Sequence, residues 1–278
     1  MNWKDIEPSD LSQLKEIRIQ YHQIVQVVSA VGRHYLDASE VDDNATLYWN
    51  RANGSLVGQW VQTESGPVRA GFQLSEAKLY LENSSTFEKL PVAGKTLGQL
   101  MVWMEEQAGR LALPTSGFST DAPYELPTYP KLSSRGFDVE PGPMTHSLSS
   151  YYASSFEILD SLQWDFTVEA DVLVYPHHFD QALSFKLKDS GSYDTSTFLT
   201  LGMSPGDEEF DAPYFYVNSW PHVDESVLKP LTAGRWYTSD WIGGLVTIEE
   251  LWGVDNQREY LETFYKETSS QLQTFLLD

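Results

Sequence analysis

Residues 46–82 decide the fold, and they read TLYWNRANGSLVGQWVQTESGPVRAGFQLSEAKLYLE. Runs rich in aromatic and β-branched residues alternate here with turn residues, as in short antiparallel strands. We predict four strands, at 46–50, 55–63, 68–74 and 77–82. Asn53-Gly54 is a typical two-residue hairpin turn between the first two, and Ser65-Gly66-Pro67 separates the next pair. The stretch therefore indicates an antiparallel sheet.

Amphipathic helices flank this sheet in the sequence. Over residues 11–35, apolar residues recur at steps of three and four, which places them on one helix face. Asp10, with Gln13 three residues later, predicts the start of this helix. A similar capping pair, Thr96 and Gln99, predicts a second helix that reaches about residue 108. The first part of the chain thus has the order helix, four strands, helix.

The same order recurs in the second part of the chain. We predict a helix at 147–162, strands at 166–175, 182–188, 197–203 and 214–219, an extra hairpin at 235–248, and a helix at 257–276. The fold class is therefore α+β, with helices packed on antiparallel sheets and an internal duplication of a helix–four strands–helix unit. The alternative is that antiparallel α+β proteins often repeat this order by chance.

A proline-rich segment separates the two parts. Residues 113–143 contain six prolines, which fix φ and remove backbone donors, so we expect no regular structure there. The segment is long for a loop within one domain. We predict a first α+β unit at 1–112, a connecting segment at 113–143 and a second, more acidic α+β unit at 144–278.

The charge of the chain narrows the choice of partners. The formal net charge of −22 disfavours nucleic acid and anionic membrane surfaces. Residues 141–278 hold 22 acidic and 6 basic residues, which favours a cationic ligand, a metal or a basic partner. An acidic surface kept for solubility explains the same composition. The oligomeric state is not predicted.

The cysteine content limits the chemistry that the chain can perform, and targeting signals in the sequence indicate where the protein is located. The chain has no cysteine, which excludes disulfides, thiolate metal sites and cysteine nucleophiles. The first residues lack the pattern of a signal peptide, and no segment approaches 18 apolar residues. We expect a cytoplasmic protein.

Candidate site residues are densest between residues 176 and 222. His177 and His178 are adjacent, so on a strand they would point to opposite faces, and Asp180 would share the face of His178. Imidazole and carboxylate together bind divalent metals or form a general base, with Asp207 and His222 as further members. The alternative is a strand end at which histidine caps backbone groups in a turn.

A second pattern is aromatic. Tyr214 and Tyr216 alternate with Phe215, so both tyrosines face one side of a strand together with Asn218. Such a face suits a small-molecule pocket, and it equally suits a half-exposed sheet packed on a helix. Trp220 and the aromatics of residues 236–241 extend the pattern.

A serine-hydrolase motif is present only in outline. Residues 202–206 read GMSPG, which matches the G-x-S-x-G nucleophile elbow. The elbow needs the residue after the serine to donate its backbone N–H to an oxyanion, and Pro205 has no N–H. A turn at a strand end explains the segment instead.

Several short segments resemble a bacterial family that is known only as a domain of unknown function. They are Tyr21-His22-Gln23 with Gln26, His178-Phe179-Asp180, Ser204-Pro205-Gly206, Tyr214-Phe215-Tyr216 and Trp220-Pro221. Their spacing runs over most of the chain. The family has no established activity, so the resemblance implies no catalytic residue.

The leading hypothesis is a small-molecule-binding protein with a pocket in the second unit. The pocket would be formed by Tyr214, Tyr216, Trp220, His178, Asp180 and His222. A metal-dependent hydrolase is the competitor, with a divalent metal held by His178 (or His177), Asp180, Asp207 and His222. A structural or protein-interaction role is the third possibility, and whether the protein is an enzyme is left open.

Overall fold

The helix predicted at residues 11–35 is α1 (Leu11–Tyr35) of a computed structural model, which describes residues 3–38, 43–64, 66–83, 87–127, 135–166 and 170–277. Asp10 caps α1 as predicted, because its carboxylate accepts from the backbone N–H groups of Ser12 and Gln13. Tyr21 on the buried face packs edge-on against Phe72, with ring centroids 4.6 Å apart. The predicted amphipathic helix is confirmed.

The chain forms two compact units that do not follow sequence order. Unit 1 comprises Met1–Ser9, Ser150–Leu173 and Asp180–Asp278, and unit 2 comprises Asp10–Ser149 and Val174–Phe179. Unit 2 thus takes in the proline-rich segment 113–143, whose described residues 113–127 and 135–142 form no helix or strand. The chain therefore enters each unit more than once.

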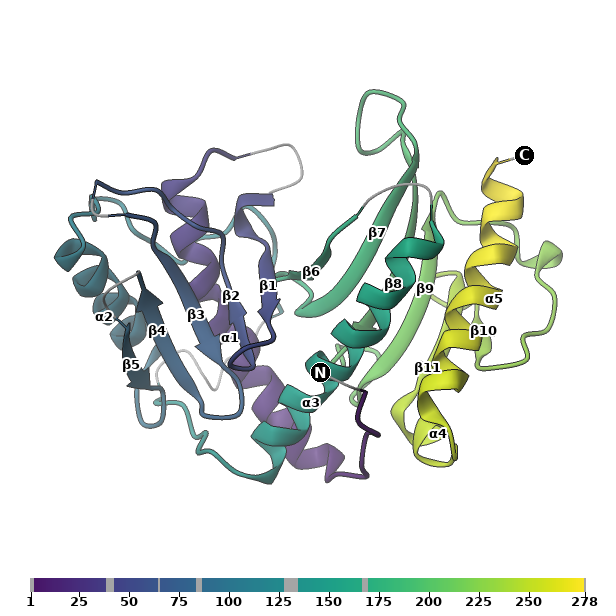
Figure 1. Cartoon of the computed structure of the whole chain (residues 1–278), viewed down its shortest axis with the longest axis horizontal. Coiled ribbons are helices and arrows are strands. Elements are labelled where there is room, and N and C mark those ends of the chain that lie inside the picture. Colours follow the sequence, from purple (N-terminus) through teal and green to yellow (C-terminus); the bar gives the residue numbers. More distant parts are fainter. Residues whose placement is uncertain are drawn as a thin grey trace. The chain divides into compact units, whose positions relative to one another are not determined.

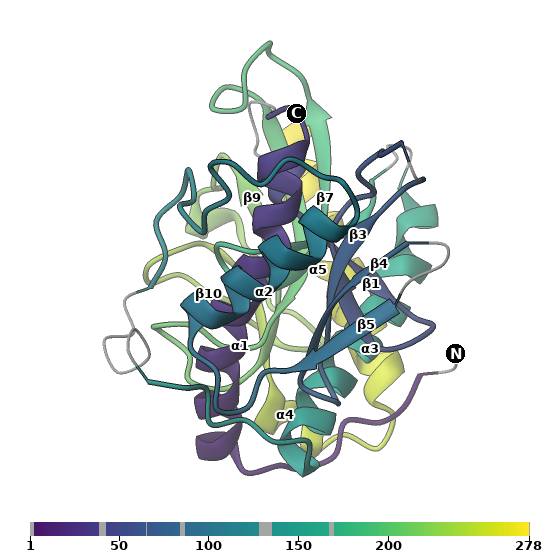
Figure 2. The same cartoon turned by 90° about the vertical axis from the view of Figure 1, so that its left-hand side faces the viewer.

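The sheet of unit 2 is an antiparallel meander with α1 and α2 packed on it (Figures 1 and 2). Its strands pair in chain order and are β1 (Leu47–Asn50), β2 (Ser55–Val57), β3 (Arg69–Gln73), β4 (Lys78–Glu82) and β5 (Phe87–Pro91). The capping box at Thr96 and Gln99 starts α2 (Leu97–Arg110), which contacts α1 and β4.

The fifth strand of unit 2 corrects the predicted count of four. β5 reads FEKLP and is largely exposed, with two charged residues and a terminal proline. Charges and proline are typical of edge strands because they discourage further pairing. They also remove the period-two pattern from which a strand is predicted, so β5 was missed.

The sheet of unit 1 is also antiparallel (Figure 1). Its strands pair in the order β7 (Asp180–Lys188), β8 (Thr197–Ser204), β9 (Tyr214–Trp220), β11 (Gly243–Thr247) and β10 (Arg235–Tyr237). The last helix is α5 (Gln257–Leu277), which follows the short α4 (Ile248–Trp252). An α+β fold of antiparallel sheets with packed helices is confirmed.

Two elements carry the chain from one unit into the other. α3 (Pro143–Leu162) starts in unit 2 and enters unit 1 at Ser150, and β6 (Val172–Tyr175) leaves unit 1 after Leu173. The described residues also include the short 3-10 helices η1 (Asp43–Ala45), η2 (Gln163–Asp165) and η3 (Glu225–Val227).

Helix α5 covers one face of the unit 1 sheet. A Cβ added at Gly244 would touch Phe264 and Thr268 of α5, so the outward direction at Gly244 points to this helix. Val217 pairs directly with Gly244 and therefore shares that face. Because side chains alternate along a strand, Tyr214 and Tyr216 of β9 lie on the face opposite α5.

The two units share one local feature besides the order of their elements. Tyr80 lies over Gly71 on the neighbouring strand of unit 2, and Tyr216 lies over Gly202 in unit 1. In each pair the ring fills the space of the missing side chain, which stabilises a glycine within a strand. A duplication predicts such a correspondence, and the duplication itself stays a prediction.

The N-terminal segment belongs to unit 1. The side-chain amide of Gln257, at the start of α5, accepts from the backbone N–H of Ile6 at 2.7 Å and donates to its carbonyl at 3.1 Å. The hydroxyl of Ser154 donates to the carbonyl of Lys4 at 3.1 Å. These bonds attach residues near the beginning of the chain to α5 and to α3.

Candidate functional site

His177 and His178 lie in a turn and not on a strand. Residues 176–179 form the turn between β6 and β7, with Phe179 at a φ of 60°. The argument that adjacent histidines point to opposite sheet faces therefore does not apply. His178 is exposed and His177 is half-buried, and both belong to unit 2.

The turn is held by two side chains of α1. His22 Nε2 donates to the carbonyl of Pro176 at 3.0 Å, and Gln26 Nε2 donates to the same oxygen at 2.7 Å. The His22 ring also stacks on Phe179, with centroids 5.5 Å apart. These contacts favour the turn alternative for this segment, because they bind the backbone of the turn within unit 2.

The surroundings of His22 and His177 favour the neutral form of both rings. Burial lowers the pKa of His22 to about 4 against the opposing effect of its hydrogen bond to Pro176, and Arg18 and His178 lower it further. Burial likewise lowers the pKa of His177 to about 4, with contributions from His178 and His22.

His22 was not predicted as a site residue. The sequence signals for it are its place on an apolar helix face, one turn before Gln26, and its presence in the segment Tyr21-His22-Gln23 that resembles a family of unknown function.

Asp180 and Tyr216 form the first polar pair of unit 1. Asp180 opens β7 and is 7 % exposed, and the hydroxyl of Tyr216 donates a hydrogen bond to its carboxylate. Tyr216 reaches this position from β9 because its ring crosses over Gly202 of the intervening β8. The pair depends on the absence of a side chain at residue 202.

Asp207 and Tyr214 form the second polar pair. The Tyr214 hydroxyl donates to Asp207 at 2.6 Å, and the backbone N–H groups of Glu209 and Phe210 donate to the other carboxylate oxygen at 2.8 and 2.7 Å. Burial raises the pKa of Tyr214 well above its usual value, and the charge of Asp207 adds to this effect. The Tyr214 hydroxyl therefore stays protonated and acts as a donor.

An aromatic cluster surrounds these two pairs. It consists of Phe210, Tyr214, Tyr216, Tyr237 and Trp241. Successive ring centroids lie 4.9 to 6.3 Å apart. Tyr214 and Tyr216 are buried, whereas the other three rings are half-buried. Phe210 has no strand period to mark it in the sequence, because it lies in a loop among acidic residues.

Carboxylates line the exposed side of the aromatic cluster. The Tyr237 hydroxyl donates to Asp240 at 3.0 Å. Partial desolvation and then the neighbouring Asp240 raise the pKa of Glu209 above its usual value. Negative potential is therefore concentrated where the cluster meets solvent, which favours positive charge and disfavours anions.

Trp220 and His222 do not join this cluster. Strand β9 has seven residues, so Tyr214 and Trp220 are roughly 20 Å apart along it at about 3.3 Å per residue. The strand register agrees, since Tyr214 pairs with Ser204 at one end of β8 and Trp220 pairs with Phe198 at the other. The structure thus divides the predicted ligand-binding residues of unit 1 into two groups.

The predicted metal ligands are divided in the same way. Asp207 and Asp180 lie at the Tyr214 end of the sheet, whereas His222 follows the opposite end of β9. Among the described residues, no group of three or more histidine and carboxylate side chains is placed to hold a metal ion. The structure therefore does not bring the four predicted ligands to one centre.

Two surface hollows lie elsewhere, in unit 2. Each has a volume of about 370 Å³, and they share Ala93 and Gly94. One extends over residues 135–140, and the other extends over Lys95, Gln99 and Trp103 at the start of α2. None of the predicted site residues lines either hollow.

Comparison of the chain with protein-family models, with curated proteins and with solved structures finds no match. The resemblance to a family known only as a domain of unknown function therefore stays a prediction. Within the part of the chain that the structure describes, no helix has both the length and the apolar character needed to cross a membrane.

Proposed function

We propose that this chain is a small-molecule-binding protein whose site is the aromatic cluster with its carboxylates, on the face of the unit 1 sheet opposite α5. The observation that carries the proposal is the pairing of two tyrosines with two carboxylates side by side. The ring centroids of Tyr214 and Tyr216 are 6.0 Å apart, and their hydroxyls are held by Asp207 and Asp180.

The position of the helix supports this proposal. A helix packed over the tyrosines would have favoured the alternative of a half-exposed sheet face serving only as core. Instead α5 covers the side of β9 that carries Phe215 and Val217. The half-buried rings of Phe210, Tyr237 and Trp241 leave aromatic surface for a ligand to contact.

The groups present define the ligand chemistry. An ionised carboxylate only accepts hydrogen bonds, so Asp207, Glu209 and Asp240 favour a ligand that carries donors. Aromatic faces contact flat apolar groups and attract cations. An anionic ligand would be repelled by the same carboxylates. We therefore expect a neutral or cationic small molecule with N–H or O–H groups.

A thermal-shift screen tests this function. The full chain is mixed with a set of amines, polyols and nucleosides, and its melting temperature is measured. A ligand at a hundred times its Kd stabilises the folded state by about 2.7 kcal/mol, which gives a shift of a few degrees. We expect hits among donors and none among dicarboxylates or phosphates.

Two variants assign each hit to a site. Trp241→Ala removes a half-buried ring of the aromatic cluster and should abolish the shift. Trp60→Ala is the matched control, since Trp60 is an exposed tryptophan of unit 2, and it should retain the shift. Hits that survive Trp241→Ala unchanged, or a screen without hits, would refute the proposal in favour of a structural role.

A further inference from the structure

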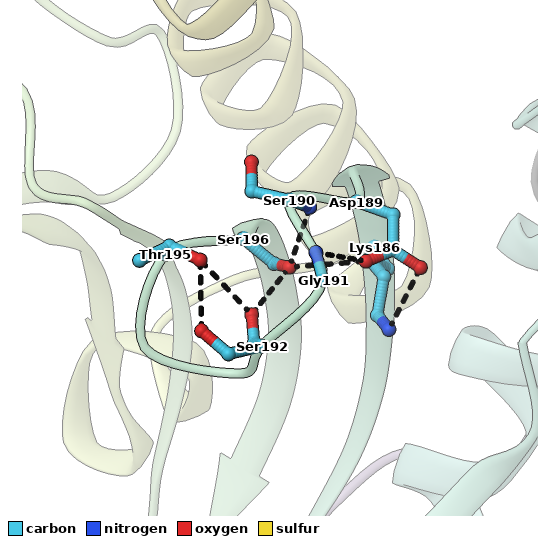
Figure 3. A network of polar contacts seen from close by, with 7 residues as sticks. All are labelled: Lys186, Asp189, Ser190, Gly191, Ser192, Thr195 and Ser196. Atoms are coloured by element: carbon cyan, nitrogen blue, oxygen red, sulfur yellow. Dashed lines mark hydrogen bonds and ion pairs between the residues drawn. The ribbon is translucent and has the colours of Figure 1, made fainter.

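The hairpin loop between β7 and β8 is braced by its own polar groups. Figure 3 shows this network, in which the Ser196 hydroxyl accepts from the N–H of Ser190 at 3.1 Å and donates to the carbonyl of Ser192 at 2.6 Å. Asp189 accepts from the N–H of Gly191 at 3.0 Å and lies 3.4 Å from the ammonium group of Lys186. The loop 189–196 therefore has a defined conformation.

Aromatic side chains of this loop and of the adjoining ends of β8 and β9 lie at the surface. Tyr193 at its tip is 54 % exposed, and its ring lies 4.7 Å from that of Phe198. Trp220, which pairs with Phe198 across the strands, is 47 % exposed and donates to the carbonyl of Asp194 at 3.1 Å. His222 lies 5.8 Å from Trp220 between ring centroids. These four residues form what we call the end patch.

The surroundings of the end patch are acidic. Asp189 and Asp194 lie in the loop itself, and Asp224 and Glu225 follow His222 in the chain; all four are exposed. The hydrogen bond from the Gly191 backbone N–H and the charge of Lys186 lower the pKa of Asp189, and hydrogen bonds from Ser226 lower the pKa of Asp224. The patch thus combines aromatic faces with carboxylates that remain charged.

One cation already occupies part of this surface. The ammonium group of Lys186 lies 6.0 Å from the centroid of Phe198 while it pairs with Asp189. An aromatic face and a carboxylate therefore share one positive charge within the chain. Tyr193 and Trp220, together with the exposed carboxylate of Asp194, offer the same two kinds of group to a cation from outside.

We propose that the end patch is a docking surface for a Lys- and Arg-rich segment of a partner protein. Charge complementarity selects this occupant, because residues 141–278 hold 22 acidic and 6 basic residues and the patch lies among exposed carboxylates. Exposed rings attract guanidinium and ammonium groups, and the braced loop needs little further ordering when a partner binds. This surface is separate from the aromatic cluster and does not depend on it.

Fluorescence anisotropy measures the binding of labelled nona-arginine to the docking surface. Labelled nona-glutamate, which carries the opposite charge, is the control peptide. We expect nona-arginine to bind the full chain in 150 mM NaCl and nona-glutamate not to bind. The double variant Tyr193→Ala/Trp220→Ala removes both exposed rings without changing net charge. It should weaken nona-arginine binding about tenfold, the loss expected for two exposed cation–π contacts.

A matched double variant separates the end patch from general attraction to an acidic protein. Trp60→Ala/Phe87→Ala removes two exposed aromatic residues of unit 2 and should bind nona-arginine like the wild type. Equal binding by the wild type and the Tyr193→Ala/Trp220→Ala variant overturns the proposal, as does an equal loss in both double variants. If circular dichroism shows that the Tyr193→Ala/Trp220→Ala variant is unfolded, the single variant Tyr193→Ala replaces it in the test. We expect this variant to bind nona-arginine about threefold more weakly than the wild type.

Sedimentation velocity tests whether the end patch binds a second copy of the chain instead of a basic segment. A dimer that Trp220→Ala dissociates and that nona-arginine leaves intact would assign the end patch to self-association and overturn the proposal.

Discussion

Gly202 is the residue on which the aromatic cluster depends. A Cβ at this position would lie 2.5 Å from the Tyr216 ring, so Gly202→Ala must displace the ring and weaken its bond to Asp180. Overpacking of a buried site typically costs 1–3 kcal/mol, and we expect a loss of about 2 kcal/mol in the free energy of unfolding. Urea denaturation measures this loss.

Gly98→Ala is the control for Gly202→Ala. The nearest atom to a Cβ at Gly98 is Thr96 Oγ1 at 3.9 Å, and the residue lies exposed in α2. Replacing a helical glycine by alanine is expected to be neutral or to stabilise by up to about 1 kcal/mol. A Gly202→Ala variant as stable as Gly98→Ala would show that Tyr216 does not need the space.

His22 makes the stability of the fold depend on pH. Its pKa is about 4 in the folded state and about 6.5 in an unfolded chain, so the unfolded state binds the proton more strongly. The stability contribution is therefore complete above pH 6.5 and is lost as pH falls from 6.5 towards 4. For a side chain this deeply buried, the loss is roughly 3 kcal/mol at most.

Urea denaturation at pH 7 and pH 4.5 measures this effect. The difference in unfolding free energy between the two pH values should be smaller for His22→Gln than for the wild type. His146→Gln, at an exposed position, should keep the wild-type difference. An unchanged pH dependence in His22→Gln would mean that this histidine is not held neutral by the fold.

The conformation of the loop in the β7–β8 hairpin depends on Ser196. Ser196 is fully buried, and its hydroxyl bonds to Ser190 and Ser192 within loop 189–196. Ser196→Ala removes both of these side-chain bonds, and the loss of two hydrogen bonds costs about 1–2 kcal/mol. We expect faster chymotrypsin cleavage after Tyr193, whereas Ser239→Ala at an exposed position should leave the cleavage rate unchanged. An unaltered rate in Ser196→Ala would show that the network does not brace the loop.

Elements with strong local signals could be predicted from the sequence. The spacing of apolar residues and the cap at Asp10 were sufficient for α1, and Thr96 with Gln99 was sufficient for the start of α2. α3 starts at Pro143, four residues before the predicted start, because proline fits the first turn of a helix. The predicted strand 55–63 is shorter in the structure, where β2 ends at Val57.

At the scale of the whole molecule, the division into units follows contacts that no local pattern reveals. Residues 3–9 join unit 1 through the paired bonds between Ile6 and Gln257, which are 251 positions apart. Gln257→Ala should lower the free energy of unfolding by about 2 kcal/mol, since two buried backbone groups lose their partner. Gln273→Ala, near the other end of α5, is the control and should change it by less than about 0.5 kcal/mol. Thermal or urea unfolding that fails to separate the two variants would contradict this role of Gln257.

Only part of the candidate site could be predicted from the sequence, because the site also depends on contacts between residues that are far apart in the chain. Alternation along β9 correctly placed Tyr214 and Tyr216 on one face, but it also suggested Trp220 as their neighbour. Alternation fixes the face of a strand and not the distance along it, so residues at opposite ends of β9 were combined. The pairing of Asp180 with Tyr216 depends on strand order and on Gly202, and neither follows from spacing in the sequence.

The measurement that tests the proposed ligand site most directly follows the indole N–H signals of the nine tryptophans by NMR during titration with a thermal-shift hit. Assignment comes from the Trp241→Ala and Trp60→Ala spectra. Binding at the aromatic cluster predicts that the Trp241 signal moves progressively with ligand while the Trp60 signal stays in place. A titration in which Trp60 responds and Trp241 does not would place the ligand outside the cluster and contradict the proposed site.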